Sequence, residues 1–359
     1  MGGKLHKTDN QQNNKIRIES EPFRQFTSAL YQSAGVPKAD ADAVSRMQVE
    51  TDERGVFSHG TRALSGYVRG ILNGEINPKP TPQVLTDAPS TALVDADNSL
   101  GHVAGIYAMN MAIAKADTTG FASVAVRNSN HYGAAACFAM MALPKGMIGF
   151  STTKTGGASV VPHGGMSGLL GNHPVGYAIP TKTELPIVLD MAVGQIAWGH
   201  VGTYAMEGKQ LPPGYVLNAD GKPTQDPSQA SGMLPFGGYK GHGLAIVMSI
   251  LSGVMTGGPA ACNRTPESPP DLARRGHFFF AIKVSNFCPL DEFTEAVDAE
   301  IRTVRDAPRA EGVERIYLPG ELEWLHQQDA LRNGIPLHPT HLKSLATLAD
   351  ELEVEVFWR

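Results

Sequence analysis

The sequence predicts an α/β protein in which a helical N-terminal segment precedes a layered region of strands and helices. Strand and helix patterns alternate over residues 91–153, in the order TALVDAD, a long helix ended by Gly120, FASVAVRN, a short helix and MIGFSTT. This alternation is typical of α/β layers. Before it, apolar residues recur at helical spacing in three segments, at residues 20–34, 39–54 and 62–73.

The second half of the chain continues this alternation and then becomes mainly helical. Two shorter strands are expected at residues 175–181 and 185–191, followed by a helix at 195–207 and a loop-rich stretch at 208–238. Residues 242–257 are apolar nearly all round, which predicts a buried helix. The remaining expected elements are an aromatic strand at 276–284, helices at 290–306, 321–333 and 339–351, and a final strand at 353–358.

These elements group into four regions. Residues 1–18 are polar and are expected to form a disordered lead. Residues 19–85 are expected to form a helical unit that packs with residues 290–359. Residues 86–289 form the expected α/β domain, and residues 290–359 form a mostly helical C-terminal segment.

Composition and charge exclude several classes of function. The formal net charge is −5 and no basic cluster stands out, so nucleic acid is not an expected partner. The N-terminus lacks the apolar stretch of a secretory signal, and the longest apolar run, at 244–255, is too short to span a membrane. The three cysteines form no CxxC pair, which is typical of a reducing compartment. We therefore expect a cytoplasmic protein without a membrane partner.

Common cofactor and metal motifs are absent from the sequence. There is no GxGxxG fingerprint, so pyrophosphate binding at an ordinary first strand–helix turn is not supported. There is also no Walker A loop and no HExxH zinc helix. We expect no metal site.

Residues 54–62 read RGVFSHGTR and place a histidine at a junction between two helices. The junction frees the His59 imidazole from a packed helix face, and Ser58 stands beside it. Arg62 follows within one turn, so it would bind a substrate carboxylate while His59 supplies an acid/base group next to it. The alternative is a capping Ser-His pair beside a surface arginine.

Residues 128–133 read NSNHYG and directly follow the expected strand FASVAVR. Active sites in α/β layers collect at strand ends. This stretch has more side-chain donors than a connecting turn needs, and Asn130 and His131 are among them. The alternative is a cap for the helix that follows.

Two further stretches carry polar or glycine-rich patterns. GNHP at 171–174 precedes a strand, and Asp190 ends the strand PIVLD, where it would accept from a ribose hydroxyl or orient a histidine. Alternatively, Asp190 caps the helix that follows it. FGGYKGHG at 236–243 leads into the apolar helix, and its glycines, Gly238 included, let the backbone approach a ligand. Free N–H groups of the helix and Lys240 would suit a cofactor phosphate, and the alternative is a turn with a solvated lysine.

Together these stretches supply an acid/base group, a carboxylate-binding arginine and a phosphate site without a metal. This combination suits hydride transfer, in which the cofactor performs the redox step and the protein manages one proton. The order of the stretches resembles the malate/L-lactate dehydrogenase family of the non-Rossmann type. Members of that family include ureidoglycolate and sulfolactate dehydrogenases, 2,3-diketogulonate reductase and piperideine/pyrroline-2-carboxylate reductases.

The resemblance runs from about Phe23 to Glu323, through SHG, NSNHYG, GNHP, LDMA, GGYKGHGLA, GHFF and YLPGE. It implies a mixed sheet layered with helices, in the L-sulfolactate dehydrogenase-like, non-Rossmann nicotinamide-binding fold. The α/β domain of residues 86–289 would then bind the cofactor. The resemblance also implies a homodimer with its active site near the subunit interface.

The resemblance further implies roles for individual residues. His59 matches the proton donor to the substrate oxygen, and His131 matches a second acid/base; with Arg62 they form the expected catalytic set. The expected substrate-binding residues are Ser58, Arg62 and Asn130. The expected cofactor-binding residues are Asp190, Met191, Ala192, Lys240, Gly238, Thr155, His173, Gly320 and Glu321.

Two stretches depart from the family pattern. The chain has GNHP where GTNP is common, and DMAVG at 190–194 where DMATS is common. The expected function is NAD- or NADP-dependent interconversion of a small 2-hydroxy acid and a 2-oxo acid. The alternatives are reduction of cyclic imine 2-carboxylates and, because of the two altered stretches, a catalytically silent binding paralogue.

Overall fold

The computed structural model describes residues 15–258 and 275–358. The chain divides into two compact units, each considered by itself below. The helical unit comprises Met1–Lys79 and Leu322–Arg359, and the sheet unit comprises Pro80–Glu321. The sequence had grouped residues 290–321 with the helical C-terminal segment, whereas this division includes them in the sheet unit.

The helical unit forms where the periodicity of apolar residues predicts helices. Its helices are α1 (Ser20–Ser33), α2 (Lys38–Glu53), α3 (Leu64–Leu72), α9 (Glu321–Asn333) and α10 (Pro339–Glu351). Proline at the first position of α10 has no N–H to leave unsatisfied, and the His338 side chain accepts from Thr340 N at the same end. A short antiparallel pair, β1 (Ile16–Ile18) and β12 (Ile335–Leu337), joins the two halves of this unit.

Two expectations about the chain ends need correction or restriction. Residues 1–14 of the expected disordered lead lie outside the described residues, and Ile16–Ile18 form a strand. The final strand expected at 353–358 is wrong, because this stretch follows α10 without strand structure. Its apolar residues pack instead: the Trp358 ring lies edge-on to Phe26, with ring centroids 4.5 Å apart.

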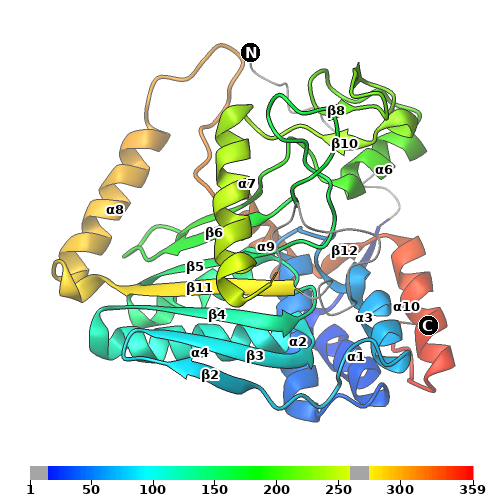
Figure 1. Ribbon diagram of the computed structural model, residues 1–359, viewed down its shortest axis with the longest axis horizontal. Coiled ribbons are helices and arrows are strands. Elements are labelled where there is room, and N and C mark those ends of the chain that lie inside the picture. Colours follow the sequence, from blue (N-terminus) through cyan, green and yellow to red (C-terminus); the bar gives the residue numbers. More distant parts are fainter. Residues whose placement is uncertain (1–14, 259–274, 359) are drawn as a thin grey trace. The chain divides into compact units, whose positions relative to one another are not determined.

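The sheet unit is built on one seven-stranded sheet with the order β2-β3-β4-β11-β5-β6-β7 (Figure 1). Only β3 and β4 pair in parallel, and every other neighbouring pair is antiparallel, so the sheet is mixed as expected. Its strands are β2 (Gln83–Asp87), β3 (Thr91–Ser99), β4 (Phe121–Ser129), β5 (Met147–Thr153), β6 (Pro174–Ile179), β7 (Ile187–Ala192) and β11 (Arg275–Lys283).

Helices lie on both faces of this sheet, and the alternation along β11 separates the two faces. His277 and Phe279 contact Tyr132 and Phe138, on the side of α4 (Gly101–Thr119) and α5 (Ala135–Met140). Phe278 belongs instead to a buried cluster with side chains of α7 (Tyr239–Ser252), which lies across the sheet in Figure 1.

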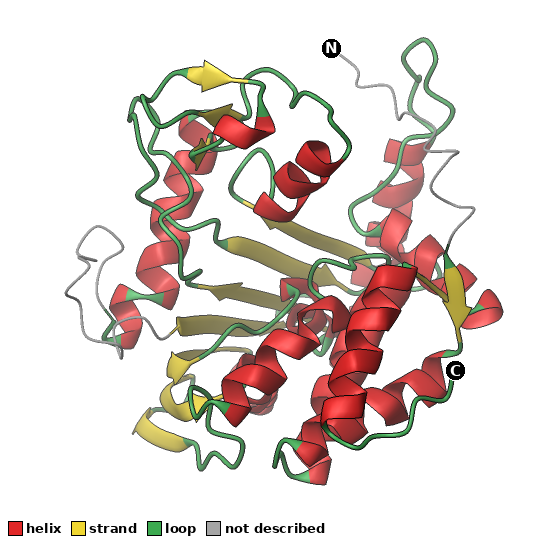
Figure 2. Cartoon of the chain, turned by 90° about the vertical axis from the view of Figure 1, so that its right-hand side faces the viewer, coloured by secondary structure: helices red, strands yellow, loops and turns green. Residues whose placement is uncertain are grey.

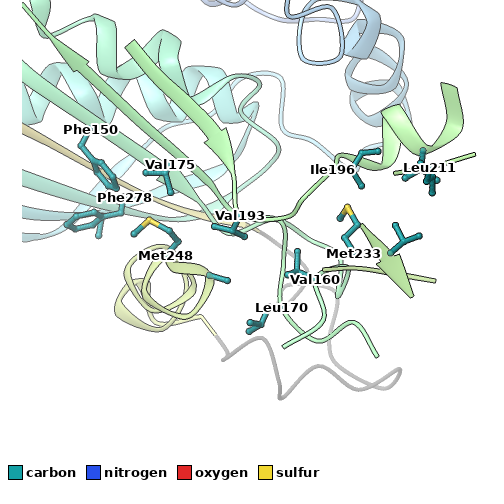
Figure 3. Close-up of a cluster of buried hydrophobic side chains, with 14 residues drawn as sticks. Phe150, Val160, Leu170, Val175, Val193, Ile196, Leu211, Met233, Met248 and Phe278 are labelled. Atoms are coloured by element: carbon teal, nitrogen blue, oxygen red, sulfur yellow. The ribbon is translucent and has the colours of Figure 1, made fainter. Parts of the chain in front are cut away.

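The helix expected at 195–207 is present as α6 (Trp198–Met206). The stretch after it, expected to be loop, also contains a small three-stranded sheet of β8 (Val216–Leu217), β9 (Pro223–Thr224) and β10 (Gly232–Met233). Figure 3 shows Val193 between the side chains near Phe150 and Phe278 and those near Val160 and Met233. A shared apolar cluster therefore joins the large sheet to the small one.

Helix α7 is less buried than the sequence predicted. Ala245 and Met248 are buried against the sheet, but Ile246, Val247 and Ile250 are 39%, 48% and 48% exposed. The helix is apolar all round, so the sequence could not reveal that the described residues cover only one of its faces.

The C-terminal part of the sheet unit carries α8 (Leu290–Arg305). Figure 2 shows the described helices in red and the described strands in yellow. Among the described residues, no helix combines the length and apolarity that a membrane crossing requires.

Candidate active site

The loop after α2 carries the first predicted acid/base group. Ser58 is exposed, and its Oγ lies 2.9 Å from Nδ1 of His59, whose ring is partly exposed. Arg62 follows in a short 3-10 helix, Thr61–Ala63, and is exposed. Residues 58–62 are called the first loop below. They present a guanidinium that could bind a substrate carboxylate and an imidazole that could exchange a proton with the neighbouring substrate oxygen.

The buried carboxyl group of Asp52 fixes the first loop by hydrogen bonds. Asp52, on the last turn of α2, accepts hydrogen bonds at Oδ2 from Thr61 N (3.0 Å) and from Thr61 Oγ1 (2.5 Å). Gln48, one turn earlier, donates from Nε2 to Gly60 O at 3.3 Å. Gly60 has no room for a side chain, because an added Cβ would lie 2.0 Å from Asp52 Oδ1. The loop backbone is therefore fixed on both sides of Gly60.

Burial changes the protonation of the groups around Thr61. It raises the pKa of Asp52 to about 7, although the two hydrogen bonds from Thr61 act in the opposite direction. His341, from α10, places Nε2 at 3.3 Å from Thr61 Oγ1, and burial lowers the pKa of this imidazole to about 4. The nearby charge of Arg62 also lowers the pKa of His341. The first loop thus rests on groups that burial drives toward their neutral forms.

The second predicted acid/base group lies in the sheet unit, after the end of β4. His131 is partly buried, and its Nδ1 accepts from Gly133 N at 3.4 Å. Asn130 donates from Nδ2 to Asn98 O (3.1 Å), Asn98 Oδ1 (3.0 Å) and Ser99 O (2.9 Å). The amide hydrogens of Asn130 therefore join residues 130–133, the second loop below, to the end of β3.

Tyr132 anchors the second loop in the protein interior. Its ring stacks on Phe138, with centroids 4.7 Å apart, and on His277, with centroids 4.9 Å apart. Burial raises the pKa of the Tyr132 hydroxyl well above its ordinary value, and the charge of Asp190 raises it further. The tyrosine next to His131 is therefore neutral and lies within the electrostatic influence of Asp190.

Asp190 connects the second loop to strand β7. Its Oδ2 accepts from Ala136 N at 2.9 Å, at the start of α5, the helix that follows the second loop. A carboxylate at this position satisfies a backbone donor that the helix itself leaves unpaired. Met191 and Ala192 follow on the same strand and are partly exposed.

The turn with Gly320 and Glu321 lies against the same strand. Val188 N donates to Pro319 O at 3.0 Å, and a Cβ on Gly320 would lie 2.6 Å from Val188 O. Glu321 is buried, where it accepts from Leu318 N at 3.0 Å and pairs with Arg305 and Arg315. Gly320 is thus placed by close backbone packing on β7, and the charge of Glu321 is compensated within the turn.

The GNHP stretch meets the chain that follows β7. Asn172 Oδ1 accepts from Gly194 N at 2.7 Å, and His173 O accepts from Val193 N at 3.2 Å. A Cβ on Gly194 would lie 2.9 Å from Asn172 Oδ1, so a side chain there would press on this contact. The two stretches that depart from the family pattern therefore fit each other.

His173 is buried and does not expose its ring. Its Nδ1 accepts from Thr155 N at 3.1 Å, and burial, with the charge of Lys154, lowers the pKa of the imidazole to about 4. A Cβ on Gly171 would lie 2.3 Å from Thr155 Oγ1. His173 and Thr155 are thus brought together, with the histidine holding the backbone of the threonine.

The glycine-rich turn before α7 closes on the same segment. Phe236 N donates to Val193 O at 2.9 Å, and Gly238 has a φ of 65°, which favours glycine. The expectation of free helix N–H groups is wrong for positions 240–242, because these amides donate to carbonyl groups of residues 236–238. Lys240 is exposed, and its ammonium forms no ion pair within the described residues. An anion at this turn would therefore be bound by the Lys240 ammonium and the helix dipole.

Four stretches that are far apart in the sequence thus meet along residues 188–194 of the sheet unit. They are the second loop with α5, GNHP, the turn at Gly320 and the turn before Lys240. Among the residues described here, no group of three or more His, Cys, Asp or Glu side chains is placed to hold a metal ion.

The family model for malate/L-lactate dehydrogenase matches residues 18–346. The chain belongs to this family. A malate dehydrogenase from Pyrococcus horikoshii is 36% identical over 354 residues, covering 95% of this chain and 97% of that protein. An L-sulfolactate dehydrogenase from Methanocaldococcus jannaschii is 33% identical over 341 residues, covering 94% and 98%. A ureidoglycolate dehydrogenase (NAD(+)) from Escherichia coli K12 is 29% identical over 325 residues, covering 90% and 93%.

Solved structures of the family share this fold. The structure of the malate dehydrogenase from Pyrococcus horikoshii has a TM-score of 0.86 at 34% identity, with 96% of this chain and 97% of that chain covered. The structure of a delta1-piperideine-2-carboxylate reductase from Pseudomonas syringae has a TM-score of 0.81 at 27% identity, covering 93% and 100%. The protein is therefore an oxidoreductase of the dehydrogenase family.

Several residues that hold these loops were not found from the sequence. Asp52 carried a usable signal, because Gln48 and Asp52 are a polar pair four residues apart on a helix face that also includes Val44. His341 carried none, since it acts on a residue more than a hundred positions away. His277 lies in the GHFF stretch of the resemblance, but that stretch did not indicate its contact with Thr153, which is also more than a hundred positions away.

Proposed function

We propose that this family member is an NAD- or NADP-dependent dehydrogenase that interconverts a small 2-hydroxy acid and the corresponding 2-oxo acid. The observation that carries the proposal is the convergence of the predicted cofactor segments on residues 188–194. The turns at Gly320 and before Lys240 connect to this stretch through backbone contacts, and Asp190, within the stretch, accepts a hydrogen bond from Ala136 N through its carboxylate.

The residues of the sheet unit fit a nicotinamide dinucleotide. Lys240 offers an exposed ammonium beside a glycine turn, as a phosphate requires, and Asp190 offers a carboxylate on a strand that Met191 and Ala192 continue. The cofactor, when bound, supplies or accepts the hydride. The similarity to a dehydrogenase named for NAD(+) supports trying NAD first.

The first and second loops carry the groups that the acid substrate needs. Arg62 would bind the substrate carboxylate through its planar guanidinium, and Ser58 would orient the His59 ring. His59 would give a proton to the substrate oxygen during reduction and remove it during oxidation. His131, with Asn130 beside it, would serve as the second acid/base or orient the substrate.

We also propose that the protein acts as a cytoplasmic homodimer. The exposed side of α7 supports the dimer, because Val247, Ile250 and, just beyond the helix, Val254 and Met255 are each 47% or 48% exposed. Grouped apolar side chains of this kind are typical of a surface that another chain covers. The absence of a cysteine framework supports a reducing compartment.

A second candidate function is the reduction of cyclic imine 2-carboxylates. The similarity to the structure of a delta1-piperideine-2-carboxylate reductase favours it, since such a substrate carries the same carboxylate for Arg62. The silent paralogue is disfavoured by the fit between Asn172 and Gly194, because the two altered stretches form a hydrogen bond rather than a gap.

A spectrophotometric screen tests the proposal. NADH and NADPH are each supplied with malate- and lactate-type 2-oxo acids and with pyrroline- and piperideine-2-carboxylates, and cofactor oxidation is followed. Turnover of a 2-oxo acid supports the main proposal, turnover of the imines alone supports the second candidate, and failure to bind either cofactor supports the silent paralogue.

Two variants assign the roles once a substrate is found. His59→Ala should lower kcat by about 10²–10⁴-fold with cofactor affinity nearly unchanged. Lys240→Ala should weaken cofactor binding by about 1.5–3 kcal/mol, as measured by calorimetry, because one charge-assisted contact is lost. Normal turnover of the first variant, or normal cofactor affinity of the second, would contradict the assigned role.

A further inference from the structure

A buried histidine outside the residues assigned so far lies at the centre of the large sheet. His277 is on β11, between β4 and β5, and is fully buried. Its Nδ1 lies 2.7 Å from Thr153 Oγ1 at the end of β5, and its Nε2 lies 2.8 Å from Ser129 Oγ at the end of β4. The imidazole therefore bridges the two strand ends that flank it.

The neighbouring carbonyl group sets the direction of these hydrogen bonds. Thr153 Oγ1 donates to Gly276 O at 3.1 Å, so it accepts the proton of His277 Nδ1. Nε2 of His277 is then unprotonated and accepts from the Ser129 hydroxyl. In this arrangement every donor of the set has an acceptor, whereas in the other tautomer the Ser129 hydroxyl would have no acceptor among the described residues.

The charge state of His277 is fixed as well. Burial lowers the pKa of its imidazole to about 3, and the charge of Arg275 acts in the same direction. The ring is therefore neutral across the pH range in which an ordinary histidine titrates.

The same ring supports the second loop. Tyr132 lies between His277 and Phe138, and its ring is within 10° of parallel to the histidine. On the other side of the loop, a Cβ on Gly101 would lie 2.4 Å from Asn130 O and 2.5 Å from His131 O. The loop backbone is thus held between the start of α4 and a stack of three rings, with Ser129 immediately before it.

We propose that His277 is a positioning residue for His131. By bridging Ser129 to Thr153 and stacking beneath Tyr132, it sets the backbone from which the His131 imidazole is presented. The consequence for turnover rests on the proposed function. The bridge itself does not, so it has a test of its own.

The bridge is tested by the tautomer of His277. Protein labelled with 15N-histidine is examined by long-range nitrogen–proton NMR, and the His277 signal is identified by its loss in His277→Gln. The expected result is a proton on Nδ1, none on Nε2, and no titration between about pH 5 and pH 9. A proton on Nε2, or a titrating ring, would overturn the bridge whether or not a substrate is known.

The positioning role is tested by a pair of substitutions at Thr153. Thr153→Val keeps the shape but removes the hydroxyl that accepts from His277, and Thr153→Ser keeps the hydroxyl. We expect Thr153→Val to lower kcat by about 10–100-fold, because misplacement of a catalytic group by about 1 Å has effects of this size. KM for the cofactor should stay near the wild-type value, and Thr153→Ser should restore most of kcat.

A control separates positioning from general loss of stability. Thr294→Val removes a buried hydroxyl that donates to Leu290 O at 3.0 Å within α8, so it should leave kcat unchanged. Wild-type kcat in Thr153→Val would reject the positioning role while leaving the dehydrogenase function in place. If no substrate is turned over at all, the proposed function fails. The positioning role is then decided by NMR: a shift of the His131 signal in Thr153→Val but not in Thr153→Ser supports it, and no shift in Thr153→Val rejects it.

Discussion

Each of the two loops that carry the predicted acid/base groups is held by a buried ionisable side chain, which is an acid for the first loop and a base for the second. The first loop rests on the carboxyl of Asp52, which bonds to Thr61. The second loop rests on the imidazole of His277, which stacks under Tyr132. Burial raises the pKa of the carboxyl to about 7 and lowers that of the imidazole to about 3.

This difference has one physical origin and two consequences. Burial favours the neutral form of both groups, which is the protonated form of an acid and the deprotonated form of a histidine. The neutral His277 therefore keeps the same hydrogen bonds throughout the working pH range. Asp52 becomes charged near neutral pH, so the hydrogen-bonded contact between Asp52 and Thr61 changes from neutral to charged within that range.

The largest expected effect is on the pH dependence of stability in Asp52→Asn. The folded protein keeps the Asp52 proton up to about pH 7, whereas an unfolded chain releases it near 3.8. Wild-type stability relative to Asp52→Asn should therefore fall as the pH rises from about 4 to about 7, and then level off. Each unit of pKa corresponds to about 1.4 kcal/mol, so the fall is at most about 4 kcal/mol by denaturant unfolding.

A second carboxyl in the same unit provides the control. Hydrogen bonds from Lys38 and Ser28 lower the pKa of Asp42, so this group is ionised in folded and unfolded chains alike above about pH 5. The difference between wild type and Asp42→Asn should then be flat from about pH 5 to pH 8. A flat difference for Asp52→Asn as well would show that Asp52 is already charged, and the contrast between the loops would disappear.

Intermediate effects are expected from adding a methyl group to a glycine in each loop. A Cβ at Gly60 would lie 2.0 Å from Asp52 Oδ1, and one at Gly133 would lie 2.6 Å from His102 Nε2. Overpacking of this kind costs about 1–3 kcal/mol. Gly133 also has a φ of 78°, a left-handed conformation that costs a residue with a side chain roughly a further 1 kcal/mol. Gly133→Ala should therefore destabilise more than Gly60→Ala.

Gly66→Ala is the matched control for both substitutions. Nothing lies within 4 Å of a Cβ at this position in α3, and alanine favours a helix. Its denaturant midpoint should stay at or slightly above that of the wild type. If Gly60→Ala behaves like Gly66→Ala, the first loop is not packed against Asp52 as described.

The elements that the sequence predicted well are those whose pattern is local. Helices at 321–333 and 339–351 occur with the expected bounds, because their apolar spacing and capping signals lie within the segment itself. The prediction of a final strand was wrong because a strand also needs a partner, and a short alternating run cannot show whether a partner strand is present. The β1–β12 pair shows the reverse, because its two strands are over 300 residues apart and neither is recognisable alone.

The candidate site divides in the same way. His59, His131, Asp190 and Lys240 could be chosen from sequence because their stretches combine reactive side chains with glycines at element ends. What holds them could not be chosen, because it depends on which distant segments meet. The Asn172–Gly194 hydrogen bond and the His277 bridge both required the arrangement of the sheet.

The smallest expected loss of stability concerns Asn130. The two loops should differ here in whether the loss depends on pH, and not in how large it is. Asn130→Ala removes the donors to Asn98 O, Asn98 Oδ1 and Ser99 O, a loss of about 0.5–1.5 kcal/mol in denaturant unfolding. No group in this contact titrates near neutrality, so the loss should be the same at about pH 5 and pH 8, unlike that of Asp52→Asn.

Asn73→Ala serves as the comparison, because Asn73 is exposed at the end of α3 and should be neutral to this change. Unchanged stability of Asn130→Ala together with a raised KM for the acid substrate would mean that the amide serves the substrate and not the loop. A loss that varies with pH would mean instead that the second loop, like the first, rests on a group that changes charge.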